Sequence, residues 1–235
     1  MTLGGGARGG RGIEYLRQGE GARRRFVLGA GAALLAGPAA AAGIAFDAAW
    51  QAFEFRRIPA TRYAHDGARL EVVAERSSSV LWRVLPEALW GAGRARWRWE
   101  VAESVPATDI GLRGGEDRNL SLYFVFMARR DAARAAGDSL TRAMRRRSAR
   151  AVIYVWGGAR PRGAAVPSPY FDGRGTSVVL RPAGTGAHSE EVDLRADHAL
   201  LFGAPPEALV AVAVSADSDD TGSVMRGAVE GLEIV

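Results

Sequence analysis

Alternation of apolar and polar side chains is the strongest structural signal in this chain. It is cleanest over residues 94–101, where small and aromatic residues, Trp97 and Trp99 among them, alternate with arginines. Successive side chains of a β-strand point to opposite faces of a sheet, so a period of two predicts a half-buried antiparallel strand. We expect the two tryptophans to face the core. The arginine face should lie in solvent, beside acidic partners on neighbouring strands.

Other apolar runs predict further strands. Residues 120–127 are almost wholly apolar and rich in aromatics, which is typical of a central strand covered on both faces. Residues 131–150 favour a helix, and residues 197–202 favour a short helical turn. More strands are expected at residues 50–56, 69–75, 79–85, 152–156, 178–181, 209–215 and 229–235. Roughly nine or ten short strands with one convincing helix predict an all-β fold, an antiparallel β-sandwich of the jelly-roll kind with one helix inserted at about 131–150.

The first 42 residues have the order of an export signal. Arginines at 23–25 precede Phe26, an apolar run continues to Leu35, and small residues at 39–42 offer a cleavage site. The arginines and Phe26 resemble the twin-arginine motif, and the apolar run is shorter than the ~20 residues of a membrane-spanning helix. The sequence therefore predicts a signal peptide at 1–42 and a single β-sandwich domain at 43–235. The mature protein is expected to be periplasmic or secreted, with membrane contact only during export.

Composition narrows the classes of function. The 235-residue chain has no cysteine, which excludes disulfides, thiolate metal sites and a cysteine nucleophile. Its net charge is +5, but residues 1–42 hold six arginines and two acids, which leaves 25 basic against 24 acidic residues beyond them. The basic run at 145–147 has no interleaved aromatics. Nucleic-acid binding is therefore not expected.

Several blocks, in order along the chain, resemble one bacterial family. They are Ser77-Ser78-Ser79-Val80-Leu81, Trp97-Arg98-Trp99, Gly115-Glu116-Asp117, Leu122-Tyr123-Phe124-Val125-Phe126, Tyr154-Val155-Trp156-Gly157, Asp193-Leu194-Arg195-Ala196-Asp197 and Asp217-Ser218-Asp219-Asp220-Thr221-Gly222. Together they resemble the DUF3047 family of exported bacterial proteins of unknown function, over about residues 50–235. The resemblance implies export and a single domain. It implies no reaction, and Arg118 stands where the family pattern has an aromatic residue.

Acidic residues lie next to the predicted strands at 120–127 and 209–215, which could be neighbours in the sheet. The candidate ligand-binding residues are Asp217, Asp219, Asp220, Glu116 and Asp117. Hard cations such as Ca²⁺ take six to eight oxygen ligands, so Asp217 and Asp219 are candidate ligands of a Ca²⁺ ion. A turn in which Asp and Thr side chains bond their own backbone is the alternative. Paired carboxylates also permit glycosidase chemistry, with Glu116 and Asp117 as the candidate catalytic residues.

Tryptophans outside the predicted core offer a second kind of binding group. Trp90 and Trp156 lie near predicted turns, where an exposed ring would stack on a sugar, and Trp156 joins the candidate ligand-binding residues. No histidine pair has metal-ligand spacing, and no nucleophile elbow is present, so no cofactor besides the candidate Ca²⁺ is expected. These features favour non-catalytic binding of a glycan or other envelope ligand. The alternative is a carboxylate-dependent hydrolase acting on envelope polysaccharide.

Overall fold

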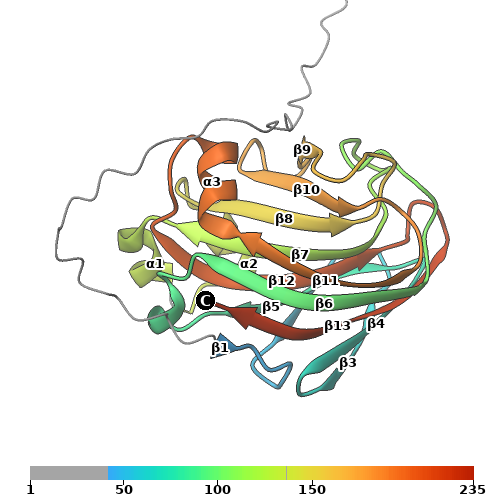
Figure 1. Ribbon diagram of the computed structural model, residues 1–235, viewed down its shortest axis with the longest axis horizontal. Helices are drawn as coiled ribbons and strands as arrows, with labels where there is room; N and C mark the ends of the chain where they lie inside the picture. The colour runs from blue at the N-terminus through green and yellow to red at the C-terminus, as the bar shows by residue number, and fades with distance from the viewer. Residues whose placement is uncertain (1–41, 136) are drawn as a thin grey trace, which may run out of the picture.

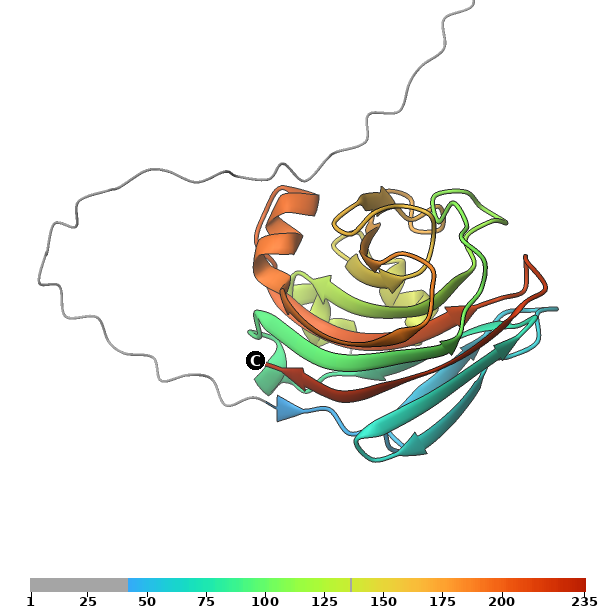
Figure 2. The same cartoon turned by 45° about the vertical axis from the view of Figure 1, so that its right-hand side comes forward.

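Two stacked layers of β-strands make up the computed structural model, which describes residues 42–135 and 137–235 (Figure 1). Figure 2 shows that the two sheets curve together. The predicted signal peptide lies outside the described residues, apart from Ala42. The two layers confirm the predicted β-sandwich.

One layer is a six-stranded sheet in the order β11-β6-β13-β4-β3, with β1 paired to β13. Its strands are β1 (Ala42–Gly43), β3 (Arg62–Asp66), β4 (Arg69–Glu75), β6 (Arg94–Glu103), β11 (Gly186–Asp193) and β13 (Val224–Ile234). Along β6, the tryptophans are buried and the arginines exposed, as predicted. Arg96 pairs with Glu233 at 2.5 Å and Arg98 with Glu230 at 3.1 Å, so the arginine face has its expected acidic partners.

The other layer is a seven-stranded sheet in the order β2-β5-β12-β7-β8-β10-β9. Its strands are β2 (Gln51–Glu54), β5 (Ser78–Val84), β7 (Arg118–Met127), β8 (Arg150–Trp156), β9 (Ala165–Pro167), β10 (Gly175–Arg181) and β12 (Ala208–Asp217). β7 and β12 are antiparallel neighbours at its centre, and nearly every residue of both is buried. The central position predicted for residues 120–127 is confirmed. Within the described ranges, β8 and β10 form the one parallel pair.

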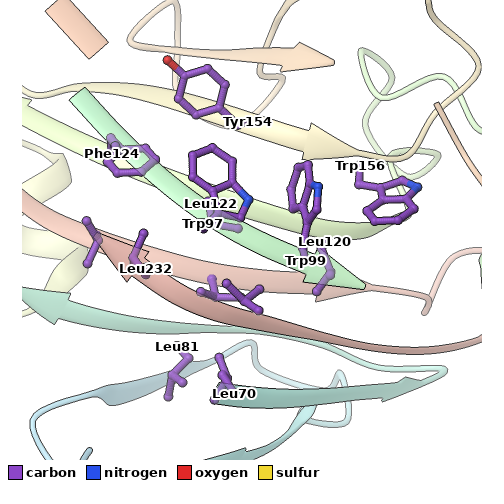
Figure 3. Close-up of a cluster of buried hydrophobic side chains, with 14 of the residues drawn as sticks. Leu70, Leu81, Trp97, Trp99, Leu120, Leu122, Phe124, Tyr154, Trp156 and Leu232 are labelled. Carbon is purple, nitrogen blue, oxygen red and sulfur yellow. The ribbon is translucent and has the colours of Figure 1, made fainter. Parts of the chain in front are cut away.

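Aromatic side chains fill the space between the sheets (Figure 3). Trp97 and Trp99 of β6 meet edge to face at 5.4 Å, and Trp99 lies 5.6 Å from Trp156 of β8. The core position predicted for Trp97 and Trp99 is confirmed. The exposure predicted for Trp156 is wrong, because its side chain faces the inner side of the sheet and is 1% exposed. Each fully buried side chain of this size contributes about 2–3 kcal/mol of hydrophobic free energy.

The single helix expected over 131–150 is wrong, because two short helices occupy this segment: α1 (Arg129–Ala135) and α2 (Leu140–Met144). Gly137 has a φ of +88°, which an α-helix does not accommodate. Ser139 then caps α2 by accepting a hydrogen bond from the Arg142 amide. The short turn expected at 197–202 is the end of a longer helix, α3 (Leu194–Phe202), which Asp193 caps.

A second apolar layer covers the outer face of the seven-stranded sheet. It includes Trp82, Tyr123, Val125, Met144, Ile153, Val166 and Ala213. Helices α1 and α2, Trp90 after the 3-10 turn at Glu87–Leu89, and the chain around β9 contribute to this layer. No helix within the described part of the chain has the length and apolar character to cross a membrane. The outer layer is incomplete and leaves a groove.

Candidate functional site

The groove has a volume of about 560 Å³ and lies over the outer face of the seven-stranded sheet. Its floor comes from adjacent strands and includes Val80, Ala213, Tyr123, Val125, Ala151 and Ile153. Along each strand these positions alternate with residues that face the tryptophan core. Alternate residues of the same strands therefore form the core on one side of the sheet and the floor of the groove on the other.

Aromatic residues form opposite walls of the groove. On the β2 side lie Phe53 and Phe55, whose rings meet edge to face at 5.4 Å. On the β9 side lie Tyr170 and Phe171. Phe55 is 37% exposed and Tyr170 is 50% exposed, so both rings remain accessible to a ligand. Exposed aromatic rings of this kind offer flat surfaces for stacking.

An ion pair lies on the floor at one end of the groove. Arg118, the first residue of β7, contacts Asp217, the last residue of β12, at 2.8 Å. Ser78 of β5 donates a hydrogen bond to the same carboxylate, and Arg118 also donates to the Tyr123 hydroxyl at 2.7 Å. Burial alone disfavours the charged guanidinium, but Asp217 and Tyr123 hold the pKa of Arg118 above its usual value. The guanidinium is therefore a fixed cation.

Asp117 connects the two acidic segments. Its Oδ2 accepts hydrogen bonds from the backbone amide and the hydroxyl of Thr221, at 2.7 and 2.6 Å. Its Oδ1 accepts a longer bond, 3.4 Å, from the amide of Asp220. Asp117 is 1% exposed and does not line the groove. Its carboxylate therefore holds the loop after β12 in place, while the neighbouring acids face the cavity.

Glu116 lines the groove at the same end and accepts a hydrogen bond from the Tyr170 hydroxyl. The guanidinium of Arg113 lies 4.8 Å from the centre of the Tyr170 ring. These contacts fasten the loop after β9 to the loop before β7. Burial and the nearby Glu116 carboxylate raise the pKa of Tyr170 to about 12, so it remains a hydrogen-bond donor at neutral pH.

Asp219 and Asp220 follow β12 and also line the groove. Within residues 42–135 and 137–235, no arginine or histidine forms an ion pair with either carboxylate. Burial, together with the nearby carboxylates of Asp217 and Asp220, raises the pKa of Asp219 to about 6. Burial and Glu116 raise the pKa of Asp220 as well. This end of the groove therefore concentrates negative charge.

The acidic residues do not form an evident metal cage. Among the described residues, no group of three or more His, Asp or Glu side chains is arranged to hold a metal ion. Asp217, one of the two candidate Ca²⁺ ligands, pairs with Arg118. The cluster offers carboxylate oxygens as hydrogen-bond acceptors, which suits a ligand that carries donors.

Comparison with known proteins gives the family. A family model described as "Protein of unknown function (DUF3047)" matches residues 48–233. The chain belongs to the DUF3047 family. The resemblance drawn from the sequence is confirmed, and the matched range includes the groove and both sheets apart from β1 and the last residue of β13.

The remaining comparisons add no activity to the DUF3047 domain. No curated protein matches the chain. Among solved structures, it is similar to the xyloglucanase domain of NopAA, a type three effector from Sinorhizobium fredii in complex with cellobiose. The identity is 9% and the TM-score 0.45, over 79% of this chain and 92% of that one.

The structure of the DUF3047 domain brings together most of the residues singled out in its sequence. Glu116, Asp217, Asp219 and Asp220 line one end of the groove, whereas Asp117 lies behind it. Trp156 is elsewhere, buried against Trp99 and His188 in the core. The groove residues missed in the sequence are Phe53, Phe55, Arg118, Tyr123, Met144, Tyr170 and Phe171. A second apolar face on the strands at 79–85 and 120–127 was the signal that would have located the floor.

Proposed function

We propose that this DUF3047 protein binds a glycan or another extended envelope ligand in the groove, without transforming it. The observation that carries the proposal is the groove itself, with an apolar floor, accessible aromatic rings on opposite walls and carboxylates gathered at one end. Ligand sites are typically concave and largely apolar, with a few polar groups that fix orientation. Aromatic walls suit the apolar faces of sugar rings, and carboxylates suit their hydroxyl groups.

The distribution of carboxylates favours binding over hydrolysis. A glycosidase places two carboxyl groups on either side of the scissile bond. Here the groove carboxylates gather at one end, and the floor between the walls consists of residues such as Ala213, Val125 and Ile153. Of the candidate catalytic pair, Asp117 is bonded to Thr221 behind the groove, and Glu116 accepts a bond from Tyr170.

Export belongs to the same proposal. Residues 1–42 would direct the folded protein to the periplasm or beyond, where envelope ligands are found. Replacing the first two arginines of the motif by lysine, Arg23→Lys with Arg24→Lys, keeps the charge and removes the twin-arginine signature. We expect the full-length variant to accumulate in the cytoplasm, whereas the parent protein appears in the periplasmic fraction. Equal export of both proteins would contradict this route.

Filling the groove tests the binding proposal. Ala213→Trp places a large ring at a floor position of the groove, where Ala213 is 4% exposed, so the melting temperature of the variant is measured first to establish that it is folded. Ala187→Trp is the matched control, because Ala187 is exposed on β11 of the other sheet. Calorimetric titration with neutral and amine-bearing oligosaccharides should show at least about tenfold weaker binding for Ala213→Trp alone, since the ring occupies the site of contact. The proposal fails if both variants bind like the parent protein, or if no oligosaccharide binds to the parent.

A further inference from the structure

The charge of the groove is unevenly distributed along its length. One end carries Glu116, Asp219 and Asp220 in addition to the Arg118–Asp217 pair, which is neutral as a unit. The basic residues that also line the groove, Arg145 and Arg174, belong to the other end, beside α2. Arg174 donates there to the carbonyl oxygens of Met144 and Arg146.

Accessible aromatic rings flank the acidic end on both sides. Glu54 pairs with Ser79 across β2 and β5, so the next residue, Phe55, lies beside Ser78, which donates to Asp217. On the opposite wall, the Tyr170 hydroxyl reaches Glu116. One face of the Tyr170 ring receives Arg113. The structure thus places one cation of the protein itself at a tyrosine of this wall.

Aromatic faces together with Asp219 and Asp220, which have no ion-pair partner within the described residues, favour an organic cation. A ring face attracts an ammonium group through its quadrupole, with a larger gain when water is excluded. A carboxylate adds charge-assisted hydrogen bonds or a direct Coulomb attraction. Neutral hydroxyl groups gain only the weaker hydrogen bonds. Resting on the proposed function, we propose that the ligand of this groove is a glycan that carries free ammonium groups, one of which binds between Phe55, Tyr170 and the carboxylates of Glu116, Asp219 and Asp220.

The protonation of Asp219 makes this binding dependent on pH. The ionisable groups that face it are Asp217 and Asp220 on its own segment, Asp117 and Glu116 from the segment before β7, and Arg118, which pairs with Asp217. Burial raises the pKa of Asp219 to about 6, with further contributions from the carboxylates of Asp217, Asp220 and Asp117. Asp219 is therefore largely neutral at pH 5 and charged at pH 7.5. An ammonium ligand should bind more tightly at the higher pH.

A pair of small probes isolates the ammonium subsite. Choline and 3,3-dimethylbutan-1-ol have nearly the same shape, but only choline is charged, and its charge does not change with pH. Titration of the full-length protein at pH 7.5, followed by NMR, should give choline about five- to tenfold tighter binding than the alcohol. Between pH 7.5 and 5, choline binding should weaken about three- to tenfold, following the ionised fraction of Asp219. Equal affinity for the two probes, or choline binding that does not change with pH, would overturn the inference.

Charge-removing variants locate the subsite. Asp219→Asn with Asp220→Asn should abolish the preference for choline and its pH dependence. The control, Asp66→Asn with Glu87→Gln, removes the same charge at exposed positions outside the groove and should leave both unchanged. A control as impaired as the groove variant would assign the effect to overall charge and overturn the proposal.

Two oligosaccharides test the source of the ammonium. At pH 6.5 the glucosamine hexamer should bind at least about fivefold more tightly than its N-acetylated form, since acetylation removes the charge. Equal binding of the two hexamers, or co-sedimentation with phosphatidylcholine vesicles in place of hexamer binding, would overturn the aminated-glycan assignment. If both hexamers bind and Ala213→Trp blocks them equally, the proposed function stands and the ammonium inference fails. If Ala213→Trp affects no ligand, the proposed function itself fails.

Discussion

The buried ion pair at the end of the groove allows a sharp test of how this site is held together. Arg118 and Asp217 have only 14% and 10% of their side chains exposed. Removing one partner of such a pair leaves the other charge buried, at a cost of about 3–5 kcal/mol. Arg118→Met keeps an unbranched side chain like the stem of arginine and removes its charge and its hydrogen bonds. We therefore expect the free energy of unfolding to fall by about 3–5 kcal/mol at pH 7.5.

The same variant should become less damaging in acid. Without Arg118, burial holds the pKa of Asp217 above its unfolded value, so the folded variant binds a proton more tightly than the unfolded chain does. That contribution to stability is present below the unfolded pKa and is lost as pH rises through the folded pKa. The cost of Arg118→Met should thus be smaller at pH 5 than at pH 8. Urea unfolding at both pH values measures it.

Two further variants complete the test. Arg118→Met combined with Asp217→Asn should lose less than the sum of the single changes, because the buried charge is gone. Arg226→Met removes an exposed arginine that pairs with Glu75 and Glu103 and should cost less than about 1 kcal/mol. If Arg118→Met costs no more than Arg226→Met, and equally at both pH values, the electrostatic account of the groove end is refuted.

Three other predictions concern neighbouring features. A Cβ at Gly157, which has a φ of +156°, would lie 2.6 Å from the Cβ of Arg118 on β7. Gly157→Ala should therefore lower the denaturation midpoint, whereas Gly91→Ala, at a position with open space around it, should not. Asp117→Ala removes both hydrogen bonds to Thr221 and should lower the free energy of unfolding by about 1–3 kcal/mol. Amide hydrogen exchange over residues 218–222 should become faster, and unchanged exchange would show that Asp117 does not hold this loop in place. Burial lowers the pKa of His198, so its contribution to stability is lost as pH falls below its unfolded pKa. The free energy of unfolding of His198→Gln should therefore decrease less on acidification than that of the parent protein. An equal decrease in both proteins would count against this.

The pattern of the sequence predicts the layers better than the site. Strict alternation at 94–101 correctly predicted which residues face the core and which face solvent, because a half-buried strand has one buried and one solvent-facing side, although Glu100 on the polar side is half-buried. In the unbroken apolar run at 120–127, the pattern could not distinguish the face toward the core from the face toward the groove, because both faces are buried. Arg118 and Tyr170 contact acids that are distant in sequence, so no local pattern indicated their roles.

The errors have equally local causes. Trp156 lies at the end of a strand, which suggested a turn, but its side chain faces the core. The helix expected at 131–150 has good helix-forming residues on both sides of Gly137, whose backbone conformation divides it. The proximity of the two acidic segments did follow from the sequence, because it required only that the strands at 120–127 and 209–215 be neighbours.

The most direct test of ligand binding in the groove is a map of where an oligosaccharide touches the protein. In the ¹⁵N-labelled full-length protein, titration with the glucosamine hexamer should shift the amide resonances of the groove, including those of Ser78, Ala213 and Asp219. The amide resonances of β6, which belongs to the other sheet, should not shift. Shifts confined to β6 and β13, with the groove resonances unmoved, would contradict the account.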